Sequence, residues 1–160
     1  MIKRYITKNA IIIFTVLLIW GGGYVYSQLT SEIPFSPPKT VVKYNGKAIP
    51  TSLGDHNWIP KSGGSSYETE GEFIVGQKTS KFIAKSGDAI HILIPSKPKD
   101  MKIVQIVNTD KYKEYKTFTG GGKDYVFTLP IEKGEYIFNV FASWDADRHN
   151  TSTIFRVQIE

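Results

Sequence analysis

Three histidines are the first residues to consider for chemistry, because histidine is the commonest metal ligand and acid–base group in proteins. His56 lies in a polar segment, His91 in an alternating apolar segment, and His149 in a polar turn just after Asp147. No two histidines have the i, i+4 or short-loop spacing typical of a zinc site, and the chain has no cysteine. A metal-assisted hydrolase that uses His56, His149 and Asp147 therefore needs the fold to bring these residues together, and it is the alternative function.

Other reactive groups do not form a recognisable catalytic motif. Residues 145–147 offer two carboxylates, but no glycine or distant glutamate completes a calcium loop, so a polar hairpin tip is the better interpretation. No Gly-x-Ser-x-Gly elbow is present, and the glycine run at residues 120–123 joins two predicted strands, which indicates a hairpin loop. Glu68, Glu70 and Glu72 alternate, which is typical of a solvated strand edge. The sequence predicts no catalytic residue, no metal and no cofactor, and so a protein that is not an enzyme.

The segment from residue 53 to residue 71 is the best candidate for a binding surface. It is long for a loop in a compact domain, and long loops are usually functional or disordered. Asp55, His56, Trp58 and Tyr67 combine aromatic and polar side chains, a mixture that binding surfaces favour. The alternative is that Trp58 caps the core of the domain instead of contacting a ligand. We expect these four residues to be the binding residues.

Residues 10–29 form the apolar segment that predicts where the rest of the chain is located. Its core consists of nine large apolar residues: Ile11, Ile12, Ile13, Phe14, Val16, Leu17, Leu18, Ile19 and Trp20. About 20 apolar residues span a bilayer as a helix, and Lys3, Arg4 and Lys8 precede them. The positive-inside rule then places residues 1–9 in the cytoplasm and the remainder outside. A cleaved signal peptide followed by secretion is the alternative.

Composition narrows the class of partner. Three of the 20 Lys and Arg residues precede residue 31 and no Asp or Glu does, so the rest of the chain has 17 basic against 15 acidic side chains. This near balance gives no support for binding to nucleic acid. The absence of cysteine in an exported domain favours a bacterial cell envelope, because eukaryotic secreted domains often use disulfides.

Beyond a Pro-rich linker at residues 30–39, the periodicity is two almost everywhere, and no helical stripe is apparent. Asn45-Gly46 predicts a hairpin between strands at 40–44 and 47–51. Further strands are expected at 73–75, 81–85, 88–95, 102–107, 112–117, 125–129, 135–144 and 153–160. These segments predict an all-β domain over residues 40–160, an immunoglobulin-like antiparallel β-sandwich. Tyr136, just after a turn, fits either a tyrosine corner or an ordinary core aromatic.

Three segments carry a resemblance to known proteins: Val42-Lys43-Tyr44-Asn45-Gly46-Lys47, Gly54-Asp55-His56-Asn57-Trp58, and Gly134-Glu135-Tyr136 with the later Trp144 and Phe155-Arg156-Val157. They resemble small membrane-anchored envelope proteins of Gram-positive, Bacillus-like bacteria that have an immunoglobulin-like domain. Such proteins often have a cysteine within the second segment, and this chain has none. The resemblance implies a fold and a location but no defined activity.

Together these features predict a membrane-tethered, non-catalytic binding or structural module outside the cell, with a protein or cell-wall partner. A second alternative function depends on the predicted helix at residues 10–29. The run Gly21-Gly22-Gly23 weakens a helix but permits close approach of another helix, so the chain would act as an accessory subunit of a larger membrane protein.

Overall fold

The computed structural model describes residues 13–17, 19–22, 33–34, 36–59, 65–119, 122–145 and 148–160. The chain divides into two units, residues 1–34 and residues 35–160, and each is described by itself.

In the first unit, residues 13–17 and 19–22 are helical. Six of the predicted anchor residues fall here, and each is between 48% and 79% exposed: Ile13, Phe14, Val16, Leu17, Ile19 and Trp20. The remaining three, Ile11, Ile12 and Leu18, lie outside the described residues. Within the described residues, no helix has both the length and the hydropathy needed to cross a bilayer.

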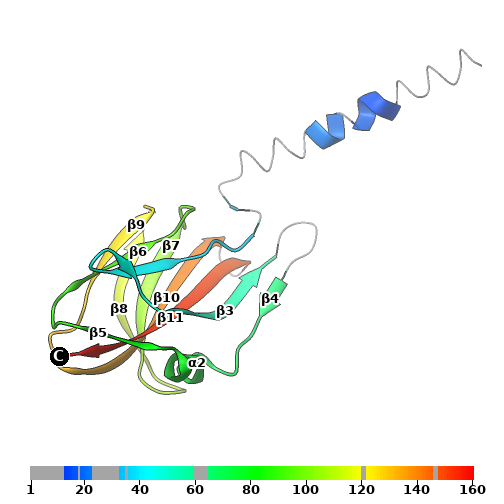
Figure 1. Ribbon diagram of the computed structural model, residues 1–160. Coiled ribbons are helices and arrows are strands. Elements are labelled where there is room, and N and C mark those ends of the chain that lie inside the picture. The colour runs from blue at the N-terminus through cyan, green and yellow to red at the C-terminus, as the bar shows by residue number, and fades with distance from the viewer. Residues whose placement is uncertain are drawn as a thin grey trace, which may run out of the picture. The chain divides into compact units, whose positions relative to one another are not determined.

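The second unit is built from two β-sheets (Figure 1). The four-stranded sheet has the order β2-β1-β6-β9, where the strands are β1 (Val41–Tyr44), β2 (Lys47–Ala48), β6 (Ala89–Leu93) and β9 (Asp124–Thr128). The seven-stranded sheet has the order β4-β3-β11-β10-β7-β8, with β5 also paired to β11. Its strands are β3 (Ser52–Trp58), β4 (Ser65–Tyr67), β5 (Lys81–Ala84), β7 (Asp100–Ile106), β8 (Tyr112–Thr119), β10 (Gly134–Asp145) and β11 (His149–Ile159). Every pairing is antiparallel except that of β5 with β11, which confirms the all-β prediction.

The two sheets pack face to face through aromatic side chains. Phe138 of β10 lies opposite Phe155 of β11 in the strand register, with ring centroids 5.3 Å apart. Phe127 of β9 contacts Phe138 from the other sheet at 5.0 Å, and all three rings are at most 1% exposed. Alternating apolar residues on β10 and β11 thus fill the space between the layers, as the period-two pattern predicted. The unit is an all-β sandwich of two layers.

Local turn chemistry fixes the first hairpin. Asn45 and Gly46 have φ angles of 48° and 76°, and Tyr44 pairs directly with Lys47. Positive φ at both central residues is the requirement of a type I′ turn, which matches the twist of the flanking strands. The predicted Asn-Gly hairpin is confirmed.

The turn before β10 contains the hydrogen bond expected of a tyrosine corner. The Tyr136 hydroxyl donates to the Glu132 carbonyl oxygen, four residues upstream, at 3.0 Å. This contact ties the start of β10 to the connection that follows β9.

One helix was missed. The predicted strand at residues 73–75 is wrong, because Glu72–Lys78 forms α2, which packs on the outer face of the seven-stranded sheet. Phe73 and Val75 pack there against a buried cluster of three isoleucines, Ile106, Ile137 and Ile154. The helix approaches closely because position 76 is glycine: an added Cβ would lie 2.3 Å from Ile137 Cγ2.

Two predicted loops also differ from the structure. The long loop expected at residues 53–71 instead contains most of β3 and all of β4, joined through residues that are not described. The connection at residues 120–123 was predicted to close a hairpin, but β8 and β9 belong to different sheets. The chain therefore passes from one sheet to the other between β8 and β9.

Candidate functional site

Strand register places three of the four predicted binding residues on one face of β3 and β4. His149 pairs with Trp58, and Thr151 pairs with His56. His149 and Thr151 are two residues apart on β11, so their partners point to the same side of the sheet. Tyr67 of β4 pairs with His56 and shares this side. The same side carries Phe155, the core phenylalanine of β11, and so it is the face toward the four-stranded sheet.

Leu53 joins this face because the β3–β11 pairing is irregular. Leu53 pairs with Thr153, whereas His56, three residues later, pairs with Thr151. The extra residue is a β-bulge, which returns Leu53 and His56 to the same side. Sequence periodicity alone would have assigned them to opposite faces.

Trp58 belongs to the core, as the alternative interpretation predicted. It is 2% exposed, and its ring meets Trp144 at 5.3 Å and His149 at 5.1 Å, both edge to face. A ligand at the surface therefore has no access to the Trp58 side chain.

Tyr67 and Leu53, by contrast, are available to a partner. They are 51% and 52% exposed. The Tyr67 ring stacks on His56 with centroids 5.6 Å apart and an interplanar angle of 25°. Because β4 and β3 form one end of the seven-stranded sheet, this exposed pair lies at the margin of the sandwich.

Asp55 does not join the other three. Its Oδ1 accepts hydrogen bonds from the Thr69 backbone N–H and from Thr69 Oγ1, both at 2.7 Å. These bonds hold the segment between β4 and α2 beside β3. Asp55 is therefore a positioning residue for one wall of the site described next.

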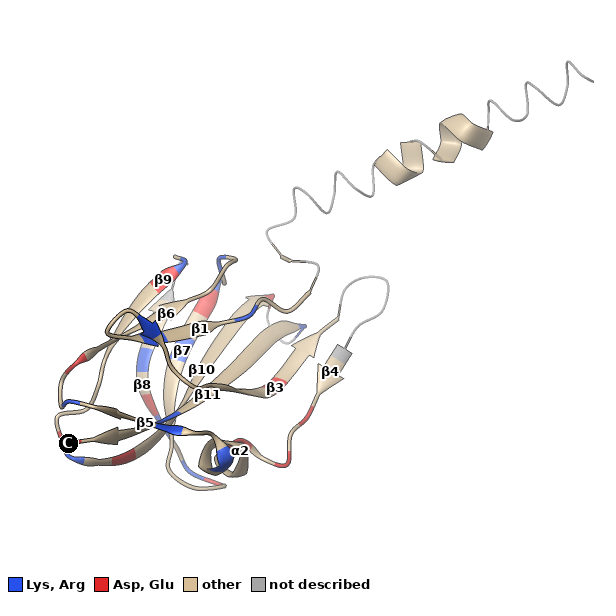
Figure 2. Cartoon of the chain, in the orientation of Figure 1, with Lys and Arg blue, Asp and Glu red and all other residues tan. Residues whose placement is uncertain are grey.

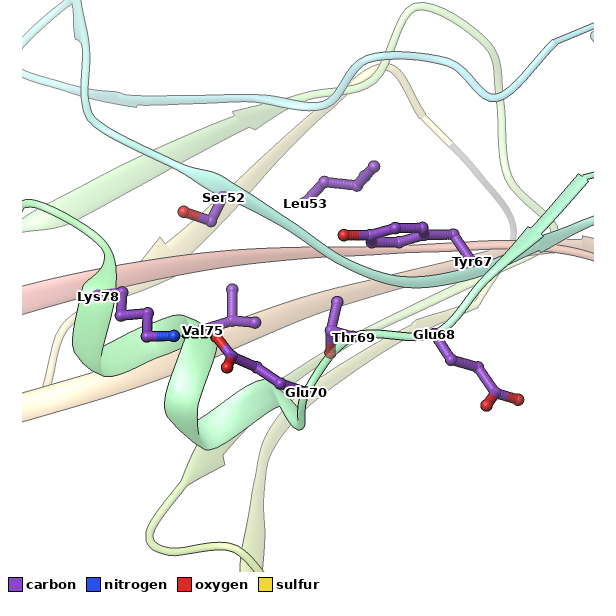
Figure 3. Close-up of a pocket in the computed structure, with 8 residues that line it drawn as sticks. All are labelled: Ser52, Leu53, Tyr67, Glu68, Thr69, Glu70, Val75 and Lys78. Atoms are coloured by element: carbon purple, nitrogen blue, oxygen red, sulfur yellow. Dashed lines mark hydrogen bonds and ion pairs between the residues drawn. The ribbon is translucent and has the colours of Figure 1, made fainter.

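β3 and the segment between β4 and α2 border a cleft of about 350 Å³ (Figure 3). We call it the edge cleft, and its lining residues are Ser52, Leu53, Tyr67, Glu68, Thr69, Glu70, Val75 and Lys78. Figure 3 shows the Tyr67 ring lying beside Leu53, with Val75 of α2 on the opposite side of β3. Apolar side chains thus come from three elements, and charged side chains surround them.

The charged groups of the edge cleft are partly paired. Lys78 Nζ donates a hydrogen bond to the Glu70 carboxylate, so these two side chains form an ion pair. Figure 2 shows the acidic residues along the segment that joins β4 to α2 and the basic residue on α2. The predicted solvated strand edge at Glu68, Glu70 and Glu72 is wrong for Glu72, which begins α2 and hydrogen bonds to Asn139 and Ser152 of the sheet.

The histidines do not form a metal site in the part of the chain that is described. His149 is 7% exposed, and its Nδ1 lies 3.7 Å from Asp145 Oδ2, while Asp147 lies outside the described residues. His91 lies in β6, with Nδ1 3.3 Å from Asp124 Oδ1. No group of three His, Asp or Glu side chains within the described ranges lies close enough to hold a metal ion.

Sequence reasoning found one aromatic of the edge cleft and missed its other side. Val75 was assigned to a strand and Lys78 to no element, and only the helix at Glu72–Lys78 brings them opposite Leu53. The available signal was the basic residue at the end of a short apolar run, which suits a helix C-terminus.

Comparison with known proteins adds no family. No protein-family model matches the chain, and no curated protein matches it.

Proposed function

We propose that this chain is a membrane-tethered, non-catalytic binding module of a bacterial cell envelope, and that it binds a segment of a protein partner in the edge cleft. The observation that carries the proposal is the half-exposed pair Leu53 and Tyr67 at an incompletely paired strand. An exposed apolar pair beside a cleft with polar rims is the usual composition of a protein-binding surface.

The strand pairing favours an extended peptide as the bound form. In the described part of the chain, β4 pairs only with His56, Asn57 and Trp58, whereas Ser52 and Leu53 have β11 as their strand neighbour on one side. An added strand would gain main-chain hydrogen bonds from such an edge, and its side chains would enter the cleft alternately. The Tyr67 ring and the Val75 side chain supply apolar contacts for them.

The tether is supported by the first unit and by the basic residues before it. Every described large apolar residue between 13 and 20 is about half exposed or more, so none of the described residues of the unit covers this apolar helix. A helix that is apolar all round needs a membrane or a protein to cover it. Lys3, Arg4 and Lys8 favour a cytoplasmic N-terminus. The tyrosine corner supports an immunoglobulin-like topology for the exported domain.

The contact test uses a photoreactive amino acid at position 53 in intact cells. We expect a cross-linked protein adduct, and we expect the substitution Tyr67→Ala to remove it. The matched control places the same group at Ile83 of β5, which is 61% exposed but outside the cleft. Equal adducts from both positions, or an adduct that Tyr67→Ala leaves unchanged, would refute the proposed site.

The topology test treats intact protoplasts with a protease. The exported domain should be degraded while residues 1–9 are spared, and a protected C-terminal domain would refute the orientation. Replacement of residues 10–29 by an unrelated anchor then separates a passive tether from an accessory subunit. A tether keeps the position-53 adduct after the replacement.

A further inference from the structure

A second pocket lies on the opposite face of the seven-stranded sheet, next to α2. We call it the sheet-face pocket. It has a volume of about 450 Å³, and its lining residues are Asp55, Gly71, Glu72, Lys102, Val104, Tyr112, Asn139, Phe141, Asn150 and Ser152. The size falls within the range of about 300–1,000 Å³ that is usual for small-molecule sites.

Neutral donors hold the carboxylate of Glu72 in place. Asn139 Nδ2 donates to both oxygens of Glu72, at 2.8 and 2.9 Å, and Ser152 Oγ lies 2.5 Å from Glu72 Oε1. Asn139 is 5% exposed and Ser152 is 1% exposed, so this floor is rigid and polar. Since no cation is bonded to Glu72 in these contacts, its charge acts on the pocket.

The aromatic wall comes from the edge strand β8. Tyr112 is 49% exposed, so part of its ring is free for stacking. Burial raises the pKa of Tyr112, and the negative charges of Glu72, Asp55 and Asp110 raise it further. The Tyr112 phenol therefore stays neutral beside the carboxylates of Glu72 and Asp55, and its hydroxyl group can both donate and accept a hydrogen bond.

Lys102 adds a positively charged hydrogen-bond donor to the pocket. Lys102 Nζ lies 5.3 Å from the centre of the Phe141 ring, within the range of a cation–π contact. The ammonium group brings three N–H donors and no acceptor to the pocket. The pocket therefore combines carboxylate acceptors, an ammonium donor, a phenol and aromatic rings.

This combination discriminates between ligand classes. A phosphate needs donors only and would be repelled by Asp55 and Glu72, whereas an ammonium ligand needs acceptors only and would be repelled by Lys102. A sugar ring carries hydroxyl groups that both donate and accept hydrogen bonds, and it has an apolar C–H face. It can therefore interact with the carboxylates, the ammonium group, the phenol and the aromatic rings of the pocket. We propose that the sheet-face pocket binds a non-acidic saccharide, with Tyr112 stacked on the sugar ring and Asp55 and Glu72 accepting from its hydroxyl groups.

This proposal goes beyond the binding of a protein in the edge cleft, and the two fail independently. Tyr67 and Tyr112 are nearly equally exposed, at 51% and 49%, and they belong to edge strands at opposite ends of one sheet. Each tyrosine is thus a matched control for the other.

The test titrates the full chain, in detergent, with a soluble trimer of N-acetylglucosamine and with cellotriose, and follows the amide NMR spectrum or the heat of binding. We expect saturable binding, with a Kd of about 1 mM or below, for at least one of the two probes. Tyr112→Ala should weaken binding by about tenfold or more, which corresponds to about 1.4 kcal/mol. Tyr67→Ala should leave it unchanged.

Asp55→Asn provides a second variant, because the amide keeps an oxygen acceptor for Thr69 but removes the charge. It should weaken sugar binding while the melting temperature is unchanged. The proposal is overturned if neither saccharide binds, if inorganic phosphate binds as well as they do, or if Tyr67→Ala and Tyr112→Ala have the same effect on sugar affinity.

Discussion

Replacing Gly76 with alanine sets two known effects against each other. In a helix, alanine is about 1 kcal/mol more favourable than glycine, so propensity alone predicts a more stable domain. The structure predicts the opposite, because the new Cβ would lie 2.3 Å from Ile137 Cγ2 and 3.2 Å from its Cδ1. Carbon atoms pack best at about 3.5–4.0 Å, so α2 would have to move by more than about 1 Å.

That movement would disturb the contacts that hold α2 on the sheet. Phe73 and Val75 would withdraw from the isoleucine cluster, and Glu72 would withdraw from Asn139 and Ser152. Overpacking of this kind costs about 1–3 kcal/mol, which exceeds the gain in helix propensity. We expect Gly76→Ala to lower the free energy of unfolding by about 1–2 kcal/mol.

Urea unfolding of residues 35–160, followed by tryptophan fluorescence, measures this change. The control adds Ile137→Ala, which removes Cγ2 and Cδ1, the two side-chain atoms that lie nearest the new methyl group. In that background Gly76→Ala should stabilise the domain by about 1 kcal/mol. A stabilising effect of Gly76→Ala in the otherwise unchanged domain would refute the close packing of α2 on β10.

Three further substitutions test the core, the turn and the surface charge. Trp58→Ala should lower the free energy of unfolding by about 3–5 kcal/mol in urea, and a loss below about 1 kcal/mol would contradict its burial. Gly46→Ala should cost about 1–2 kcal/mol in thermal unfolding, because φ at this position is 76°; an unchanged melting temperature would contradict the type I′ turn. Hydrogen bonds from Lys81 and, to a smaller extent, Arg156 lower the pKa of Glu135 from its usual 4.5. The ionised carboxylate therefore stabilises the folded domain above pH 4.5, and this stabilisation is lost as the pH falls through the lower pKa of the folded state. Glu135→Gln should therefore reduce the loss of stability between pH 7 and acid, by at most about 1 kcal/mol since the group is partly exposed, and equal pH profiles would rule out the ion pairs as contributors.

Much of the sheet could be predicted from the sequence because its signals are local. Residues 135–144 and 153–160 alternate with a period of two, and they lie in β10 and β11. Asn45-Gly46 determined its hairpin through backbone conformation alone. Each of these features depends on residues next to one another in the chain, which a reading of periodicity captures.

The candidate site was less predictable because distant residues build it. The seven residues of α2 have a glycine in the middle and β-branched Ile74 and Val75, all poor for an isolated helix. Tertiary contacts override this preference, since Asn139 and Ser152 are 67 and 80 residues away from Glu72. The bulge that turns Leu53 toward Tyr67 depends likewise on pairing with β11.

The position of β11 has a consequence for how the domain acquires its structure. This strand pairs with β10, β3 and β5, and it comes after all three in the chain. During synthesis, β5 has no described strand to pair with, and β3 has only the three-residue β4, until residues 149–159 are made. Assembly dominated by such long-range pairing is slow. Until then, the strand edges that β3 and β5 later present to β11 are unpaired, and charged side chains such as Asp55 in β3 and Lys81 in β5 oppose their association with other chains.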